Sequence, residues 1–467
     1  YEICACLVGS EMCIRDRSPR VGFRWNLDAK RNYVLRGGLG VFTGRVPFVW
    51  LSNNFSNTGI QTTSYSVYPT WNAQTGTSQV NGKDLQIIYN PNGQSVNLPA
   101  SSAGTPSKSA QTVNVFDKDF KFAQTLRANL AFDARFAGIK WTFEGLYAKT
   151  LNDMMVENLN ISATGKTFAE QYGLSFDNRP MYSKGDYSGI YKLVNTDGGY
   201  TWNLSAKAEK NFDFGLDMMA SYTYTNSKTI NNGTSSVAAS NWQYNYTHGD
   251  PNHPELSTSA FNTPHQVMVS AYYHFGKTTE RHSDVTTIGL IYQGTSGTPY
   301  TVYMNGDMNG DNGYNDLLFI PTDAQVDEML AKGMFKATTA YTAEQQAANY
   351  KQWLGNENYM KDHRGEYFER YEANQNFVHR FDFHADRKFG FMVGKRMNYI
   401  QIAFDMLNVG NFFNTKWGRT YSTTSYYSPV TYSKGQYQFL HNGDFDMRSY
   451  SDFYSRWRAQ ISLKYSF

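Results

Sequence analysis

The last eleven residues of the chain, 457–467 (WRAQISLKYSF), alternate between apolar and polar side chains without interruption. The apolar positions are Trp457, Ala459, Ile461, Leu463, Tyr465 and Phe467. Because successive side chains of a strand point to opposite faces, this segment predicts a strand with one apolar and one wet face. A strand of this kind fits a wall between lipid and a watery lumen, whereas the edge strand of a soluble sandwich is the alternative.

The same alternation returns along the chain, and the clearest internal example is residues 120–136. Its polar face carries Arg127, Asp133 and Arg135, so that face is expected to be wet. A soluble sandwich rarely needs such long strands, because strands of about five or six residues suffice there. We therefore predict an all-β fold, an antiparallel transmembrane β-barrel. The predicted strands are 21–27, 32–43, 120–136, 139–150, 201–211, 214–226, 266–276, 285–294, 377–388, 398–408 and 456–467.

Short and long connections take turns between these segments. The short ones are 28–31, 137–138, 212–213, 277–284 and 389–397, and the long ones are 44–119, 151–200, 227–265, 295–376 and 409–455. Short turns at one rim and long loops at the other are typical of outer-membrane barrels, with the long loops extracellular. A Greek-key sandwich gives no such strict alternation.

One long loop, 295–376, also carries a helical pattern. Thr322 with Gln325, and Thr342 with Gln345, have the spacing of capping boxes at helix starts. We expect two short helices in this loop.

Composition supports the barrel and excludes a spanning helix. The chain has 35 Tyr, 31 Phe and 9 Trp, so 16% of its 467 residues are aromatic, yet its mean hydropathy is −0.56. No run approaches the roughly 18 apolar residues of a membrane helix. Aromatic girdles on an otherwise polar chain suit a barrel, although an aromatic-rich sugar-binding sandwich would share the average. The net charge of +3 gives no reason to expect a nucleic-acid partner.

Residues 1–17 differ from the rest of the chain. They hold all three cysteines, Cys4, Cys6 and Cys13, and show no alternation and no signal-peptide pattern. The part CLVGSEMCIRDR resembles translated sequencing-adapter sequence. We expect 1–17 to be non-native, with genuine sequence resuming at Ser18 and continuing upstream in the source protein.

Several segments resemble the TonB-dependent outer-membrane receptors, particularly the Oar-like type related to SusC/RagA-like transporters. They are 18–25 (SPRVGFRW), 35–48 (LRGGLGVFTGRVPF), 303–321 (YMNGDMNGDNGYNDLLFIP), 364–370 (RGEYFER) and 404–414 (FDMLNVGNFFN). The family barrel has 22 strands, so the resemblance implies that residues 18–467 are its carboxy-terminal half, a partial barrel of about 11 strands. The signal peptide, TonB box and plug that the family carries before its barrel are not found in this chain.

The resemblance implies energised uptake of a large or scarce nutrient such as an oligosaccharide, a peptide or a metal chelate, across the outer membrane of a Gram-negative bacterium. The implied partners are outer-membrane lipid, the TonB–ExbB–ExbD complex acting through the missing amino-terminal region, the barrel assembly machinery and a surface lipoprotein. A passive porin-like channel and a surface adhesin built on a barrel remain alternatives, and the substrate cannot be read from the sequence.

Loop 305–316 (NGDMNGDNGYND) is a candidate calcium site. Asp307, Asn309 and Asp311 have the one-three-five spacing of oxygen ligands in a calcium loop. Leu318 stands where a bidentate acid would close such a site, although Asp316 is a possible substitute. A turn-rich loop without metal explains the same residues, since Asn, Asp and Gly favour turns.

Other candidate residues fall into sets with shared roles. Aromatic loop residues that would stack on a ligand, or pack the loops together, are Trp242, Tyr244, Tyr246, Tyr426, Tyr427 and Tyr437. Lumen-facing residues are Arg127, Asp133, Arg135, Lys207 and Glu209. The assembly signal is expected at Trp457, Tyr465 and Phe467, because a terminal strand ending in an aromatic resembles the sorting signal of outer-membrane barrels.

Enzymatic motifs are not found. His248, His253 and His265 lack regular ligand spacing and indicate a solvated loop. The chain has no Gly-x-Ser-x-Gly, no P-loop and no His-Glu-x-x-His. We therefore expect no enzymatic activity.

Overall fold

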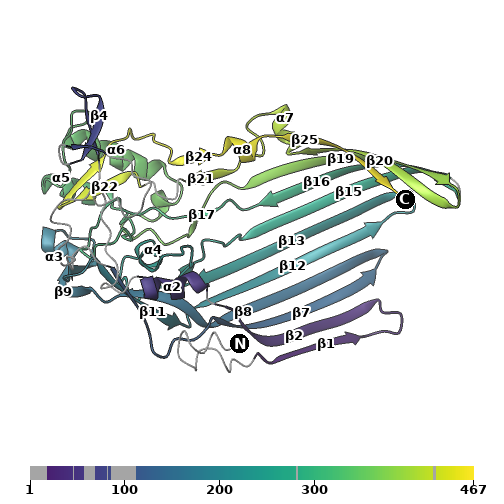
Figure 1. Ribbon diagram of the computed structural model, residues 1–467, viewed down its shortest axis with the longest axis horizontal. Coiled ribbons are helices and arrows are strands. Elements are labelled where there is room, and N and C mark those ends of the chain that lie inside the picture. The colour runs from purple at the N-terminus through teal and green to yellow at the C-terminus, as the bar shows by residue number, and fades with distance from the viewer. Residues whose placement is uncertain are drawn as a thin grey trace.

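The structure, a computed structural model, describes residues 18–45, 47–56, 69–80, 83–85, 112–279, 282–423 and 428–467. Long strands form one curved sheet, and the long connections between them gather at one end of it (Figure 1). We call these connections, namely the described parts of 44–123, 159–198, 230–264, 296–377 and 408–457, the loop layer.

Eleven long strands run antiparallel in chain order through the sheet. Each predicted segment forms one of them, so the predicted all-β, antiparallel architecture is confirmed. The strands are β1 (Arg20–Asn26), β2 (Tyr33–Thr43), β7 (Gln124–Phe136), β8 (Ile139–Asn158), β12 (Gly199–Asn211), β13 (Leu216–Thr229), β15 (His265–Thr278), β16 (His282–Thr295), β19 (Val378–Val393), β20 (Arg396–Leu407) and β25 (Arg458–Ser466).

The register places apolar side chains on one face of the sheet. Phe143 of β8 lies opposite Phe132 of β7 on one side and Ala206 of β12 on the other. The other face carries ion pairs, including Arg36 with Asp133 at 3.0 Å. Because one face is apolar and the other charged, the sheet has the two surfaces of a barrel wall.

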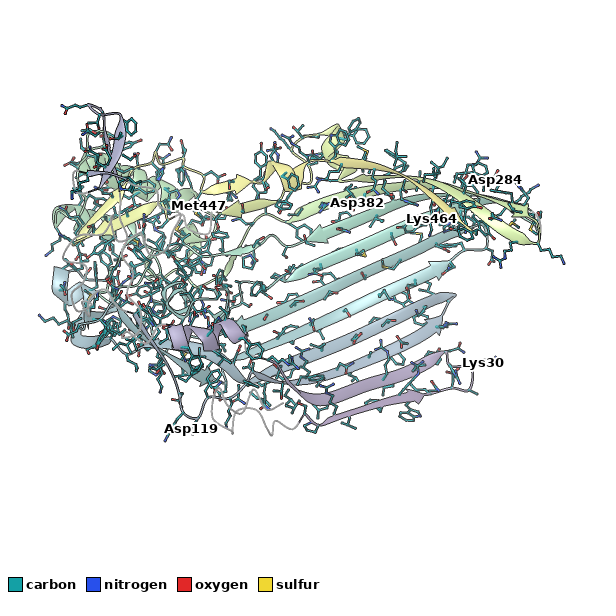
Figure 2. The ribbon with its side chains drawn as sticks, in the orientation of Figure 1. Lys30, Asp119, Asp284, Asp382, Met447 and Lys464 are labelled. Atoms are coloured by element: carbon teal, nitrogen blue, oxygen red, sulfur yellow. The ribbon has the colours of Figure 1, made fainter. Side chains whose placement is uncertain are left out.

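The turns at the end away from the loop layer are tight. Ala137 and Gly138 join β7 to β8 with φ of +55° and +70°, the left-handed backbone that a two-residue hairpin requires. Gly394 and Lys395 join β19 to β20, a shorter turn than the predicted 389–397 because both strands extend further. Lys30 and Asp284 lie at this end in Figure 2.

The sheet is not closed. Within the described part of the chain, β1 pairs only with β2, and β25 only with β20. Three more strands, β6 (Thr112–Phe116), β11 (Gly189–Thr196) and β14 (Ser257–Thr258), bring the sheet to 14 strands without joining its two edges.

Strand β8 reaches beyond the barrel wall. It was expected to end at residue 150, but it continues to Asn158 and pairs there with β11, which pairs in parallel with β6. This extension occurs because Met154, Met155 and Val156 are buried within the loop layer. The wall and the loop layer therefore share one continuous strand.

The largest buried core lies in the loop layer. It includes Phe168, Met304, Ile320, Trp353 and Phe439, each at most 1% exposed. Side chains of the sheet stand out from its surface, whereas those of the loop layer crowd together (Figure 2). The long connections thus form a packed structure above one rim of the sheet.

The two predicted helices are present as α5 (Asp323–Ala331) and α6 (Ala343–Asn356), and both begin with the expected capping boxes. The sequence indicated no other helices, and this was wrong, because helices of three to nine residues are too short to show their periodicity. These are α2 (Phe48–Ser56), α3 (Phe168–Tyr172), α4 (Ala238–Gln243), α7 (Val409–Phe413), α8 (Asp452–Ser455) and the 3₁₀ turn η4 (Met360–Asp362).

Short strands complete the loop layer. They are β3 (Thr70–Asn72), β4 (Thr77–Val80), β5 (Lys83–Asp84), β9 (Ile161–Thr167), β10 (Pro180–Lys184), β17 (Pro299–Tyr300), β18 (Ala373–Asn374), β21 (Tyr421–Thr423), β22 (Val430–Ser433), β23 (Gln436–Phe439) and β24 (Arg448–Tyr450). Among the described residues, none of the helices has the length and apolar character needed to cross a membrane.

Candidate functional site

A cavity of about 710 Å³ lies within the loop layer. Its walls come from α4 and the segments on either side of it, from β17, from the residues that flank β18 and from β21, which belong to three different long connections. The lining residues are Thr234, Ser235, Ser240, Tyr244, Tyr246, Thr298, Pro299, Tyr300, Thr301, Tyr371, Gln375, Ser422 and Thr423. We call this space the tyrosine cavity.

Stacked rings fix the tyrosines of this cavity. Tyr246 stacks on Tyr303 with ring centroids 4.5 Å apart, and Tyr371 meets Tyr246 edge-on at 6.5 Å. Tyr300 donates from its hydroxyl to Glu357 Oε1 at 2.7 Å. Burial raises the pKa of Tyr246, Tyr300 and Tyr371 above the ordinary value. Their hydroxyls are therefore neutral at physiological pH and remain able to donate hydrogen bonds.

The side-chain amide of Gln375, in the wall of the tyrosine cavity, lacks hydrogen-bond partners. Its residue is 5% exposed, and neither its Nε2 nor its Oε1 has a hydrogen-bond partner. A buried amide without partners costs free energy, about 1–3 kcal/mol for each group. Gln375 lines the cavity, but both amide atoms have almost no accessible surface, so a bound molecule reaches this donor and acceptor only when the side chain turns toward the cavity.

Arg370 is a buried residue whose hydrogen bonds stabilise the wall of the tyrosine cavity. It is 1% exposed and donates to Asn245 Oδ1, to the carbonyl of Thr229 at 2.8 Å and to the carbonyl of Glu255 at 3.2 Å. Burial lowers the pKa of this guanidinium to about 10. Arg370 therefore acts as a positioning residue that ties the end of β13 to the loop beyond it.

Tyr371, next in the chain, has φ of +57°. Such a backbone is rare for a large side chain and persists only where surrounding contacts impose it. Here its N–H donates to Thr301 Oγ1 at 2.9 Å. This strained position turns the Tyr371 ring into the cavity wall.

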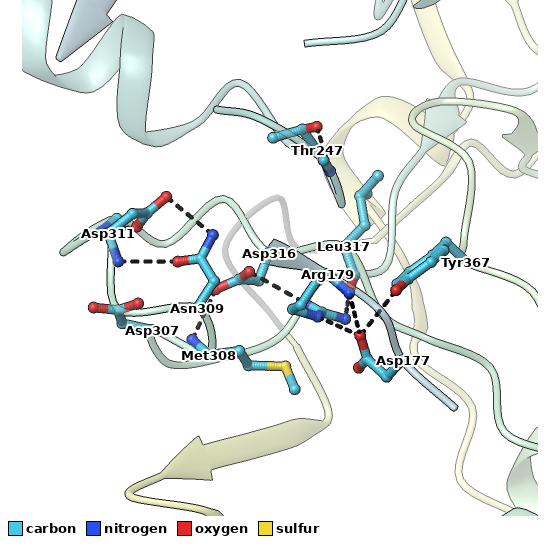
Figure 3. Close-up of polar contacts among 12 residues, drawn as sticks. Asp177, Arg179, Thr247, Asp307, Met308, Asn309, Asp311, Asp316, Leu317 and Tyr367 are labelled. Atoms are coloured by element: carbon cyan, nitrogen blue, oxygen red, sulfur yellow. Dashed lines mark hydrogen bonds and ion pairs between the residues drawn. The ribbon is translucent and has the colours of Figure 1, made fainter. Parts of the chain in front are cut away.

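A buried polar cluster around Arg179 lies beside the tyrosine cavity and is drawn in Figure 3. Arg179 donates from Nε to Asp177 Oδ1 at 2.8 Å and from Nη1 to Asp316 Oδ1 at 3.1 Å. Tyr367 donates to the same Asp177 oxygen at 2.9 Å. Burial alone would lower the pKa of Arg179, but the two carboxylates raise it. The guanidinium is thus a permanent charge that joins two long connections.

The candidate calcium loop adjoins this cluster. Asp307 accepts from the N–H groups of Gly310 and Asn312 at 2.7 and 2.8 Å, and Asp311 accepts from Gly313 at 2.6 Å. These bonds form a tight turn, and Figure 3 shows the side chains of Asp307 and Asp311 in it together with the bonds between Asp311 and Asn309. Within the described ranges, no group of three or more His, Cys, Asp or Glu side chains is arranged to hold a metal ion. Calcium binding therefore stays a prediction from the sequence.

Burial shapes the charges of this loop. It raises the pKa of Asp311 to about 8, and the neighbouring Asp316 and Asp307 add to the effect. Burial also raises the pKa of Asp316 to about 6, although Arg179 opposes that shift. The loop therefore holds more acidic groups than its one paired arginine neutralises.

The structure separates the predicted aromatic ligand residues. Tyr244 and Tyr246 line the tyrosine cavity. Trp242 packs against Tyr191 at 5.8 Å and donates to Asn252 Oδ1, and Tyr437 is buried against Phe335. These two pack the loops together. Tyr426 and Tyr427 lie outside the described residues.

The remaining candidates lie on the sheet. Arg127, Asp133, Arg135, Lys207 and Glu209 all lie on its charged face, as the register shows. Glu209 pairs with Lys140 at 2.7 Å and with Lys207 at 3.0 Å. In the assembly-signal set, Tyr465 donates to Asn398 Oδ1 at 2.6 Å, Phe467 stacks on Tyr465 and Trp457 contacts Phe412.

Sequence reasoning missed Gln375, Arg370, Tyr300 and Tyr371. Arg370 stands in the quoted RGEYFER segment, but nothing in its neighbours marks it as buried. Gln375 lies in a polar stretch, YEANQNF, that reads as an ordinary loop. Only the meeting of distant segments reveals these roles.

The chain matches the family model of the outer membrane beta barrel domain over residues 14–439, and it belongs to this family. The sheet is therefore the wall of an antiparallel transmembrane barrel in the outer membrane of a Gram-negative bacterium, with its apolar face toward lipid. No curated protein matches the chain significantly.

Solved structures give fold similarity at low identity. The outer membrane transporter YddB from Escherichia coli has 10% identity and a TM-score of 0.36, covering 84% of this chain and 37% of its own. A variant of the ferric enterobactin receptor PfeA from Pseudomonas aeruginosa has 10% identity and a TM-score of 0.36, covering 87% and 35%. The siderophore receptor PirA from Acinetobacter baumannii has 8% identity and a TM-score of 0.33, covering 96% and 41%. The chain spans less than half the length of each.

Proposed function

We propose that this chain is the carboxy-terminal part, from Ser18, of a TonB-dependent outer-membrane receptor that takes up a neutral, hydroxyl-rich solute. The solute binds first in the tyrosine cavity of the extracellular loop layer. The carrying observation is Gln375, a buried amide with an unsatisfied donor and an unsatisfied acceptor at the cavity wall. A sugar hydroxyl pair offers the complementary acceptor and donor.

The chemistry of the other lining residues supports a neutral solute. Among the described residues that line the cavity, none is charged, and all but Pro299 carry a hydroxyl or an amide. Tyrosine rings stack on the apolar faces of sugar rings, while their hydroxyls bond the edges. An anionic ferric chelate would require cationic side chains, which this lining lacks.

The dependence on TonB belongs to the same proposal. The quoted motifs resemble the TonB-dependent receptors, and the two unpaired sheet edges fit a barrel completed by further strands. In this proposal the TonB–ExbB–ExbD complex supplies energy through a region outside this chain, the assembly machinery inserts the barrel and a surface lipoprotein assists capture.

Binding is tested with the protein extracted from outer membranes in detergent. We expect maltoheptaose, a neutral oligosaccharide, to bind more tightly than ferric enterobactin in isothermal titration. Gln375→Leu removes two hydrogen bonds to the ligand and should weaken maltoheptaose binding roughly thirtyfold. The same variant should unfold at an equal or higher temperature, because an unsatisfied amide is replaced by an apolar group of similar size.

Gln171→Leu, an exposed position on α3, is the matched control and should change neither property. If the wild type and Gln375→Leu bound maltoheptaose equally well, the solute would not bind in the tyrosine cavity as proposed. Energy dependence is tested separately in cells, where a protonophore should stop uptake. Uptake that continues would support the passive channel instead.

A further inference from the structure

A second groove, of about 470 Å³, lies where β19 meets the loop layer. Its floor is the loop-layer end of β19, and its wall is the segment after α7. The lining residues are Asn376, Phe377, His379, Phe381, Gly410, Lys416, Trp417, Gly418, Arg419 and Tyr421. We call it the rim groove, and it is separate from the tyrosine cavity in its lining residues.

The register shows which face of the sheet carries the rim groove. Phe381 lies opposite Tyr292 of β16, and the pair two residues along is Phe383 with Leu290. These residues belong to the apolar face. Strands β20 and β25 stand between β19 and the sheet edge, so strands added to that edge do not cover the groove. It therefore opens toward lipid at the outer boundary of the membrane.

Aromatic side chains with polar tips form the lower part of the groove. Tyr292 contacts Phe381 with centroids 5.0 Å apart and bonds His379 through its hydroxyl, 2.8 Å from Nδ1. Trp417, 58% exposed, stands above them on the wall. Rings of this kind mark the depth at which acyl chains give way to headgroups.

The upper part of the groove is cationic. Lys416 is exposed, and Arg419 places its guanidinium 4.1 Å from the centroid of the Tyr450 ring while Nε donates to the carbonyl of Thr415. None of the described lining residues is acidic. Arg419 also interacts electrostatically with Asp452, but that carboxylate is already paired with Arg456. Positive charge is therefore in excess here.

We propose that the rim groove binds the phosphorylated headgroup of a glycolipid in the outer leaflet. Lys416 and Arg419 contact the phosphate. Both side chains are cations, and both bind phosphate groups well. The acyl chains run down the apolar face over Phe381 and Tyr292. A free phosphate would use the two cations but not the aromatic floor, whereas an amphiphile uses both.

The test is native mass spectrometry of the detergent-extracted protein with diphosphoryl lipid A. The double variant Lys416→Gln/Arg419→Gln removes two cations and should weaken binding roughly thirtyfold, given what each basic residue contributes near a charged lipid surface. The matched control is Lys395→Gln/Arg396→Gln, an equal loss of charge at the short turn on the opposite rim. It should leave lipid A binding unchanged.

Two further ligands separate the sources of phosphate. Dephosphorylated lipid A, with the same acyl chains, should bind no better to wild type than diphosphoryl lipid A binds to the double variant. Inorganic phosphate at equal concentration should not displace diphosphoryl lipid A. The proposal fails if the double variant binds like wild type, if the dephosphorylated lipid binds equally well, or if inorganic phosphate competes.

Discussion

Arg179 and Asp316 form a buried ion pair, with 3.1 Å between Nη1 and Oδ1, although 137 residues separate them in the chain. Both side chains are at most 1% exposed. The pair joins the connection between β8 and β12 to the connection between β16 and β19. It is therefore one of the ties that make separate loops into a single packed layer.

Arg179→Met should destabilise the loop layer by about 3–5 kcal/mol, because it leaves buried carboxylates without their counter-charge. Hydrogen exchange of the backbone amides between residues 302 and 320 measures the effect. Arg448→Met is the control, since its pair with Asp446 is partly exposed and should contribute at most about 1 kcal/mol. Equal protection in the two variants would contradict a special role for Arg179.

The stability of the loop layer should fall as pH rises. Burial raises the pKa of Asp311 to about 8, whereas an unfolded Asp titrates near 4. The folded state therefore holds more protons between these values, and the stability contributed by protonated Asp311 is lost as pH rises through the folded pKa. Exchange protection should drop between about pH 4 and about pH 8, and Asp311→Asn should flatten the drop. A profile unchanged by the substitution would rule out Asp311 as its source.

The calcium prediction has its own test. Asn315, 1% exposed, has an amide without partners within this loop, which fits a missing ligand. Added calcium should raise the unfolding temperature of the wild type and not that of Asp307→Asn/Asp311→Asn. Asp323→Asn, at the exposed start of α5, should respond like the wild type. No change in the wild type on chelation would contradict calcium binding.

This chain alone, refolded in micelles, should not show the heat-modifiable migration of a closed barrel. The outer edges of β1 and β25 carry backbone groups that find no strand partner within the described chain, and lipid cannot satisfy them. Electrophoresis of heated and unheated samples measures this. A compact, heat-modifiable monomer would show that the two edges join.

The sheet could be predicted from the sequence because each long strand carries its own signal. Successive side chains of a wall strand face lipid and water in turn, so every residue of the strand carries the signal. Leu126, Ala128 and Leu130 therefore predict β7 without reference to any other segment. The helices α5 and α6 were likewise marked by local capping boxes. By contrast, the end of β8 was misplaced because its outer residues are buried on both faces and lose the alternation.

The tyrosine cavity could be predicted only in part. Tyr244 and Tyr246 were predicted as ligand-stacking residues because they are aromatic, and the residue type can be read directly from the sequence. Gln375 owes its role to being buried without a partner, and burial depends on three connections meeting in space. The same limit applied to Trp242, whose side chain packs in a core that local sequence does not reveal.

Strand β8 passes without a break from the wall into the loop layer, and it pairs with β12 as far as Lys149 and with β11 from Asp153 onward. A lid moves by changing a few hinge dihedrals, but a hinge here would have to bend one extended strand that is paired both in the wall and in the loop layer. We therefore expect the proposed ligand capture at the tyrosine cavity to proceed by small shifts of segments such as α4 and β21, while the part of the layer built on β8 moves with the barrel wall.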